Sequence, residues 1–221
     1  MQKFDTPTPV QAVLDIPAGR IQLIATDRTD TTVEVRPANP AKNRDVKTAE
    51  EIQIAYTDGV LRIEAPETKS RLRGPSGSVE ITVQLPAGSH IQATAAAAEL
   101  RGVGRLGDVT FDGGYRTVKL DEAASARLTG LDATITIGRL NGPGEISTQR
   151  GDLNINQATR GTLTLNTQMG NITVDAAHGV SASLDAGTGY GRLDNTLKNT
   201  GTPDLTIHAT TSHGDITARS L

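Results

Sequence analysis

Short runs of alternating apolar and polar residues recur along the second half of the chain, and each run begins at a glycine. A glycine and one polar residue are followed by apolar residues separated by single polar ones, as in residues 151–155, 161–165, 170–174 and 214–218. Successive side chains of a strand point to opposite faces, so this alternation predicts short, half-buried strands that each follow a glycine turn.

The spacing of these units predicts how the strands are assembled. Between residues 142 and 189 the glycines recur every nine or ten residues. At a spacing of 19 residues the units fall into register: Gly151 with Gly170 and Gly189, and Ile155 with Val174 and Leu193. A coil of two strands and two turns is typical of a β-solenoid, and we predict a right-handed, β-helix-like one over residues 91–221. The alternative is an antiparallel β-sandwich, which also places turns every 8–12 residues.

Residues 1–90 show a less regular pattern. Strands are predicted over residues 11–16, 21–24, 32–35, 52–56, 60–63 and 79–85. Two polar loops, residues 37–50 and 67–77, separate them, and residues 47–51 are compatible with a single helical turn. We predict an irregular amino-terminal β-cap that covers one end of the stack and continues into residues 91–221 as one domain.

Composition sharpens this all-β prediction. The 221 residues are 36% hydrophobic but only 2% aromatic, with no cysteine and no tryptophan. A core of Leu, Ile, Val and Ala suits thin layers, and the absence of cysteine excludes a disulfide-stapled module. The net charge of −3 and the few aromatic residues argue against nucleic-acid binding, which needs basic groups and stacking platforms.

The chain shows no targeting or membrane-spanning pattern. Its first residues lack the charged and apolar regions of a secretory signal, and no stretch approaches about 18 apolar residues. We therefore predict a cytoplasmic protein that does not insert directly into a membrane.

Several motifs resemble those of a known family. Asp-Ile-Pro-Ala-Gly at 15–19, Asp-Gly-Val-Leu-Arg-Ile at 58–63 and Val-Gln-Leu-Pro-Ala-Gly at 83–88 precede the repeated Gly-Asp strands. This order is similar to that of the bacterial putative-adhesin family of unknown function, and most similar to short actinobacterial members without a signal peptide. The resemblance implies a β-helical fold and brings no catalytic residues.

Turn residues carry the candidate chemistry. At the 19-residue spacing they form two oxygen-rich rows: Asn156, Asp175 and Asp194 in one, and Asn166, Asp185 and Asp204 in the other. Carboxylates about 5 Å apart repel each other, which would favour a hard cation such as calcium. Asn and Asp also suit turns for conformational reasons alone, and this second explanation predicts no metal.

A dinucleotide fingerprint is present by sequence alone, at Gly102, Gly104 and Gly107. It is followed by a strand pattern instead of the helix that nucleotide binding needs, so no cofactor is predicted.

The carboxyl terminus ends on a predicted strand with no capping segment after it. Its exposed edge would pair with another edge, and the predicted interface residues are Gly214, Asp215, Ile216, Thr217 and Ala218. We predict a non-enzymatic binding or scaffold protein that engages a protein partner or forms a homo-oligomer. The alternative is a glycan-binding or glycan-cleaving β-helix that uses the aspartate rows.

Overall fold

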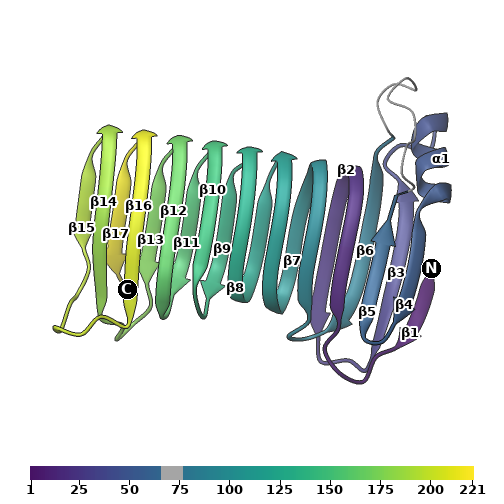
Figure 1. Cartoon of the computed structure of the whole chain (residues 1–221), viewed down its shortest axis with the longest axis horizontal. Helices are drawn as coiled ribbons and strands as arrows, with labels where there is room; N and C mark the ends of the chain where they lie inside the picture. The colour runs from purple at the N-terminus through teal and green to yellow at the C-terminus, as the bar shows by residue number, and fades with distance from the viewer. Residues whose placement is uncertain (66–76) are drawn as a thin grey trace.

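The computed structural model describes residues 1–65 and 77–221, and in them the chain is mostly β-strand (Figure 1). Seventeen strands join in one hydrogen-bonded sheet, which confirms the all-β class. Apart from Gly77, the second predicted loop lies outside the described residues.

The amino-terminal part contains the six predicted strand segments, one further strand, β1, that was not predicted, and one helix. Its elements are β1 (Gln2–Asp5), β2 (Gln11–Thr26), β3 (Asp30–Pro37), α1 (Asn43–Glu51), β4 (Gln53–Thr57), β5 (Val60–Glu64) and β6 (Val79–Pro86). The predicted strands 11–16 and 21–24 are the two halves of β2. The helix α1 is longer than the single predicted turn and packs against β3 and β6.

The rest of the chain forms a regular stack of strands. Its elements are β7 (His90–Tyr115), β8 (Val118–Asp132), β9 (Ile135–Leu140), β10 (Gly144–Arg150), β11 (Leu153–Ala158), β12 (Gly161–Met169), β13 (Ile172–Ala176), β14 (Ala182–Tyr190), β15 (Leu193–Thr196), β16 (Leu205–His213) and β17 (Ile216–Ser220).

Strands of successive turns of the chain pair in parallel. Residues 17 to 19 positions apart are neighbours, as in Val109 with Ala126, Ala126 with Gly144, and Gly144 with Leu163. The strands form two facing layers (Figure 1), and β8 bends from one layer, where it pairs with β9, into the other, where it pairs with β10. In the described residues, antiparallel pairing occurs only among strands β1 and β3–β6.

The parallel stack starts earlier in the chain than the predicted boundary near residue 90. Strand β2 pairs in parallel with β7, from Gln11 opposite His90 to Ala25 opposite Gly104. Residues 11–26, which we assigned to the cap, therefore make the first full turn of the stack. The remaining amino-terminal elements lie on the far side of β2.

The core between the two layers is aliphatic, as the composition predicted. Inward positions of the inner strands are fully buried, for example Leu163, Ile172 and Ile207 at 0% exposure. Phe111 is the one aromatic side chain among the buried core residues of the described chain. Facing layers about 10 Å apart leave little room for rings at repeated positions.

Antiparallel strands, a helix and polar contacts cover the amino-terminal end of the stack. Phe4 on β1 and Tyr56 on β4 bring their rings to 5.6 Å between centroids, so the outermost strands of the two layers meet there.

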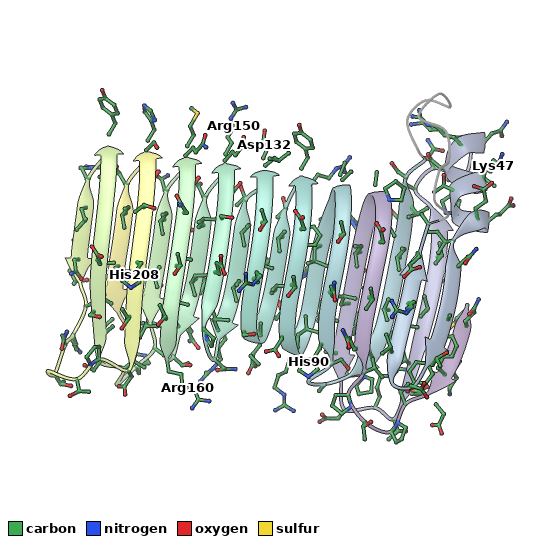
Figure 2. The ribbon with its side chains drawn as sticks, viewed as in Figure 1. Lys47, His90, Asp132, Arg150, Arg160 and His208 are labelled. Atoms are coloured by element: carbon green, nitrogen blue, oxygen red, sulfur yellow. The ribbon has the colours of Figure 1, made fainter. Side chains whose placement is uncertain are left out.

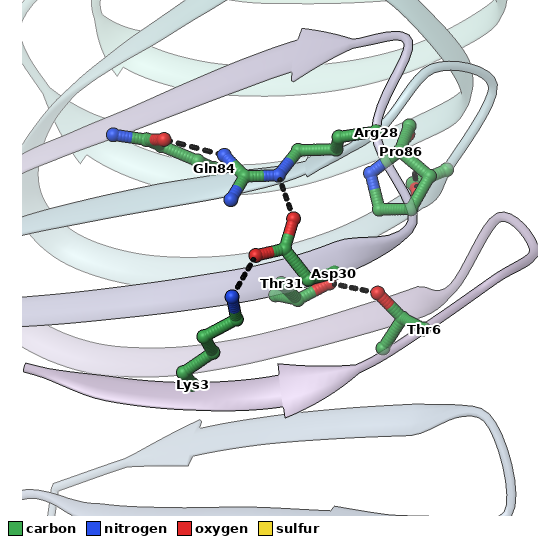
Figure 3. A network of polar contacts seen from close by, with 8 residues as sticks. Lys3, Thr6, Arg28, Asp30, Thr31, Gln84 and Pro86 are labelled. Atoms are coloured by element: carbon green, nitrogen blue, oxygen red, sulfur yellow. Dashed lines mark hydrogen bonds and ion pairs between the residues drawn. The ribbon is translucent and has the colours of Figure 1, made fainter.

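A polar network fastens these outer strands together (Figure 3). The Asp30 carboxylate accepts a hydrogen bond of 2.8 Å from the Arg28 guanidinium and lies 3.0 Å from the Lys3 ammonium. Arg28 also donates to the side chain of Gln84, so strands β1, β3 and β6 share one network.

The last two turns of the stack are out of sequence order. We call each segment that contains one strand from each of the two layers a coil. The last four coils in the sequence are residues 144–158, 161–176, 182–196 and 205–220. Coil 205–220 lies between coils 161–176 and 182–196: β16 pairs with β12 and β14, and β17 pairs with β13 and β15. Figure 1 shows the yellow strands of the chain end inside the stack, with β14 and β15 outside them.

The predicted carboxyl-terminal interface is therefore wrong. Residues Gly214, Asp215, Ile216, Thr217 and Ala218 do not form an open edge, because β17 is paired on both sides. The end of the stack is coil 182–196, which pairs on one side only in the described residues.

Candidate functional site

One corner of the stack is built by the same short motif in four coils. Strands β10, β12, β16 and β14 of one layer each end in the motif Thr-x-x-Gly, whose glycine is the first residue after the strand. The motif occupies residues 148–151, 167–170, 211–214 and 188–191. The threonines point into the corner, and those of the inner coils are buried. The Oγ1 atoms of Thr167, Thr211 and Thr188 each donate to the glycine carbonyl of the neighbouring coil, at 2.9–3.2 Å.

The glycines of this motif form a column in which backbone touches backbone. A Cβ atom added to Gly170 would lie 2.1 Å from the Gly151 carbonyl oxygen, and one on Gly214 would lie 2.0 Å from that of Gly170. Gly191 continues the column against Gly214, at 1.9 Å. Only a residue without a side chain allows the coils to stack this closely, which explains the recurring glycines.

The acidic or amide residue after each glycine links one coil to the next. The side chain of Asp152 accepts from the backbone N–H of Asn171, that of Asn171 from Asp215, and that of Asp215 from Arg192, at 2.7–2.8 Å. These bonds satisfy amides at the turn, where the strand ladder is interrupted. The repeated Gly-Asp and Gly-Asn pairs are thus structural links between coils.

The residue before each glycine of the motif, which is Arg150, Met169, His213 or Tyr190, points away from the corner. The strand register continues from Arg150 to Asp132 on β8 and to Tyr115 on β7, and no glycine follows either of these two residues. We call these six residues the corner row: Tyr115, Asp132, Arg150, Met169, His213 and Tyr190. All six are exposed. Figure 2 labels Asp132 and Arg150, which project from the ends of neighbouring strands.

The corner row combines apolar, aromatic and charged groups. Tyr190, Tyr115 and Met169 are 75%, 55% and 51% exposed. The rings of Tyr190 and His213 stack, with centroids 5.0 Å apart and planes 15° from parallel. Arg150 and Asp132 approach to 3.8 Å. With neighbouring strands about 4.8 Å apart, the six side chains span about 24 Å.

The two predicted aspartate rows are not formed. Because coil 205–220 is inserted, Asp175 lies opposite Arg219 and Asp194 lies opposite Thr217. The Arg219 guanidinium donates two hydrogen bonds to Asp175, at 2.7 and 2.9 Å, which raises the pKa of Arg219.

The second predicted row is separated for the same reason. Asn166 has Thr210 as its neighbour, whereas Asp185 lies opposite His208. Asp204 is in a turn, where its carboxylate accepts from the backbone N–H of Ser181. Within residues 1–65 and 77–221, no three His, Asp or Glu side chains converge as a metal site would require. Asn156 completes the first predicted set and lies in the bulged part of β11 that faces Asp175, but the two aspartates of that set are separated.

The glycine fingerprint is followed by a strand and not by a helix, as the sequence predicted. Residues 102–107 lie within strand β7, and the backbone N–H of Gly104 donates to the Asp121 carboxylate. No helix begins there to hold a pyrophosphate.

Sequence reasoning missed the corner row, although a signal was present. The pattern Thr-x-x-Gly-Asx-Ile-Thr occurs at 167–173 and 211–217, whereas residues 188–194 break it with Arg192 and Leu193. The match pairs coil 205–220 with coil 161–176, as in the structure. It also marks the outward position that precedes each glycine.

Comparisons with known proteins give structural similarity at low sequence identity. No protein-family model matches the chain, and neither does any curated protein. A putative adhesin from Bacteroides fragilis is 15% identical over 98% of this chain and 95% of its own, with a TM-score of 0.44. A putative adhesin from Parabacteroides distasonis is 13% identical over 100% and 95%, with a TM-score of 0.46.

Another solved structure, described as a putative lipid binding protein from Parabacteroides distasonis, is 10% identical over 97% of this chain and 95% of its own, with a TM-score of 0.44. At these identities, none of these proteins lends a residue role to this chain. Separately, none of the helices in the described residues has the length and apolar character needed to cross a membrane.

Proposed function

We propose that this chain is a non-enzymatic, adhesin-like binding protein whose rigid β-stack presents the corner row to a protein partner. We further propose that the body is a right-handed β-solenoid. The parallel pairing of segments 17–19 residues apart supports the coiled path, and the strong right-handed preference of parallel crossovers supports the hand.

The observation that carries the proposal is where the aromatic residues lie. The chain has five, of which Phe4 and Tyr56 pack together at the capped end and Phe111 lies in the core. The other two, Tyr115 and Tyr190, are exposed in the same row as Met169. These large side chains contribute little to the core, so the stability of the fold does not explain why they occur at exposed positions.

The chemistry of the row suits a protein surface. Tyr, Met and Arg are enriched in protein–protein interfaces, where large side chains exclude water and polar tips keep hydrogen bonds. The threonine and glycine contacts beneath the row hold its backbone in place. A preorganised row loses little conformational entropy when it binds.

The glycan-active alternative loses its geometric basis. It relied on adjacent carboxylates of Asp175 and Asp194, and coil 205–220 separates these residues. The cytoplasmic location predicted from the sequence stays a prediction.

Affinity capture from the native host, with quantitative mass spectrometry, tests the proposal. The three baits are the natural chain, a row variant (Tyr115→Ala, Met169→Ala and Tyr190→Ala) and a control variant (Arg160→Ala and His178→Ala). Arg160 is at the opposite end of the strands (Figure 2). All substituted side chains are exposed, so equal melting temperatures are expected.

We expect at least one protein to be captured by the natural chain and by the control, and to fall about tenfold or more with the row variant. Identical sets of captured proteins for all three baits would show that the row is not a binding surface.

A further inference from the structure

The open end of the stack leaves core positions uncovered. Leu193 on the end coil is 48% exposed, whereas Ile216, Ile172 and Leu153, which occupy the same position in the next three coils, are at most 1% exposed. In the described residues, β14 pairs only with β16, and β15 only with β17. Unpaired backbone and apolar side chains therefore occur together at one end.

The end coil is not suited to parallel extension by another coil of the same kind. Each inner coil offers an Asx side-chain oxygen to the following coil, but the end coil has Arg192 at that position. Its guanidinium instead pairs with Asp215, at 3.0 Å. This chemistry favours a partner that approaches in another orientation.

Two exposed charges at the open end suggest which orientation. Asp194 lies on β15 (Leu193–Thr196) and Lys198 lies two residues beyond the end of this strand, with Thr196 midway between them. Leu197 packs against the core, so by the alternation of an extended chain Asp194 and Lys198 both face outward. Neither charge has an ion-pair partner within the described residues. If two such segments pair antiparallel about Thr196, Asp194 of each lies opposite Lys198 of the other.

We propose that the open end docks a second copy of this chain, with residues 194–198, which begin in β15, antiparallel to their counterpart and centred on Thr196. The pairing covers Leu193 in both copies and forms two Asp194–Lys198 ion pairs related by a two-fold axis. Because the contact uses the same surface of both copies about a two-fold axis, it is satisfied by two chains and the assembly stops at a dimer. The proposed protein-binding role of the corner row is independent of this contact.

Sedimentation equilibrium with charge-exchange variants tests the proposal. The full-length chain is measured up to about 100 µM, which populates dimers with micromolar dissociation constants. Asp194→Lys and Lys198→Asp are measured alone and together, with Met169→Ala as a control on the corner row. Because both charged side chains are exposed and form no ion pair with residues 1–65 or 77–221, the melting temperatures of the monomers are expected to match.

We expect the natural chain to dimerise and each single variant to weaken dimerisation about tenfold or more, because like charges then face each other twice. The double variant restores opposite charges and is expected to restore dimerisation, and Met169→Ala leaves it unchanged. A natural chain that stays monomeric would overturn the proposal. So would a dimer that does not respond to the single variants, or one that the double exchange fails to rescue.

Discussion

The two ends of this protein finish the same stack in opposite ways. At the amino-terminal end, strands β1, β3 and β4 turn antiparallel, helix α1 packs beside them, and Phe4 meets Tyr56 across the layers. At the other end, coil 182–196 continues the parallel stack and then stops. An uncovered sheet edge can pair with another strand. The amino-terminal end is therefore covered by its own elements, whereas the end at coil 182–196 is available for contact.

The carboxyl-terminal strands lie inside the stack, paired on both sides, instead of at its edge. Coil 205–220 takes the better-matched position against coil 161–176, and the divergent coil 182–196 becomes the outer one. The last residues of the chain are thereby protected, while an internal segment with two glycines in its strand is left outside.

The largest expected effect comes from crowding the glycine column that joins the final coils. Gly214→Ala places a Cβ atom 2.0 Å from the Gly170 carbonyl oxygen, so coil 205–220 must move away from coil 161–176. We expect the free energy of unfolding to fall by about 3 kcal/mol or more, measured by chemical denaturation.

Gly187→Ala on the end coil is the matched control. No atom lies within 4 Å of its added Cβ, so stability should be unchanged or slightly higher. Equal destabilisation by the two substitutions would show that the end coil is packed as tightly as the inner one.

A smaller effect is expected from the threonine contacts at the same corner. The buried Thr211 hydroxyl donates to the Gly170 carbonyl at 3.0 Å. Thr211→Val removes this bond at similar volume and should cost about 1 kcal/mol in thermal unfolding. Thr210→Val, one residue away and exposed, should cost much less, and a reversed order of the two variants would contradict the structure.

The smallest effect concerns the closed end and depends on pH. The hydrogen bond from Arg28, with a further contribution from Lys3, lowers the pKa of Asp30 from 3.8 to about 2. A carboxyl group with a lowered pKa stabilises the fold above its ordinary pKa, and this contribution disappears as pH falls from about 4 to about 2. Asp30→Asn should narrow the stability difference between pH 5 and pH 2.

Melting temperatures of the natural chain and of Asp30→Asn, measured across this range, check the result. The contact is partly exposed, so the difference between the two proteins should shrink in high salt. Parallel pH curves for the two proteins would show that the network does not hold the closed end.

Local features of this fold were predictable from the sequence because they repeat. The alternation after each glycine places Leu153, Leu163 and Ile172 inside, and all three are buried. In the amino-terminal part, alternation also located β2–β6, but not the short edge strand β1. Helix α1 was underestimated because residues 43–51 have few apolar positions, and it is held by contacts distant in sequence, such as the Asp45 carboxylate accepting from the backbone N–H of Ser78.

The order of the coils could not be obtained from spacing alone. A constant 19-residue period aligns Gly189 with Gly170, but Gly191 occupies the column, and its neighbour there is Gly214. The loop of residues 197–204 is long enough to let the chain return past one coil, and spacing does not record such a return. The predicted aspartate rows and the predicted terminal edge both depended on sequential order, so both were wrong for one reason.

Engineered disulfides test the coil order most directly, because the natural chain has no cysteine. Thr164 is the strand neighbour of His208, which in turn is the neighbour of Asp185. We expect Thr164→Cys with His208→Cys to form an intramolecular disulfide under mild oxidation, since neighbouring strands meet the distance requirement of a disulfide. Thr164→Cys with Asp185→Cys should remain reduced, two strands apart. Efficient closure of the second pair and not the first would contradict the insertion of the carboxyl-terminal coil.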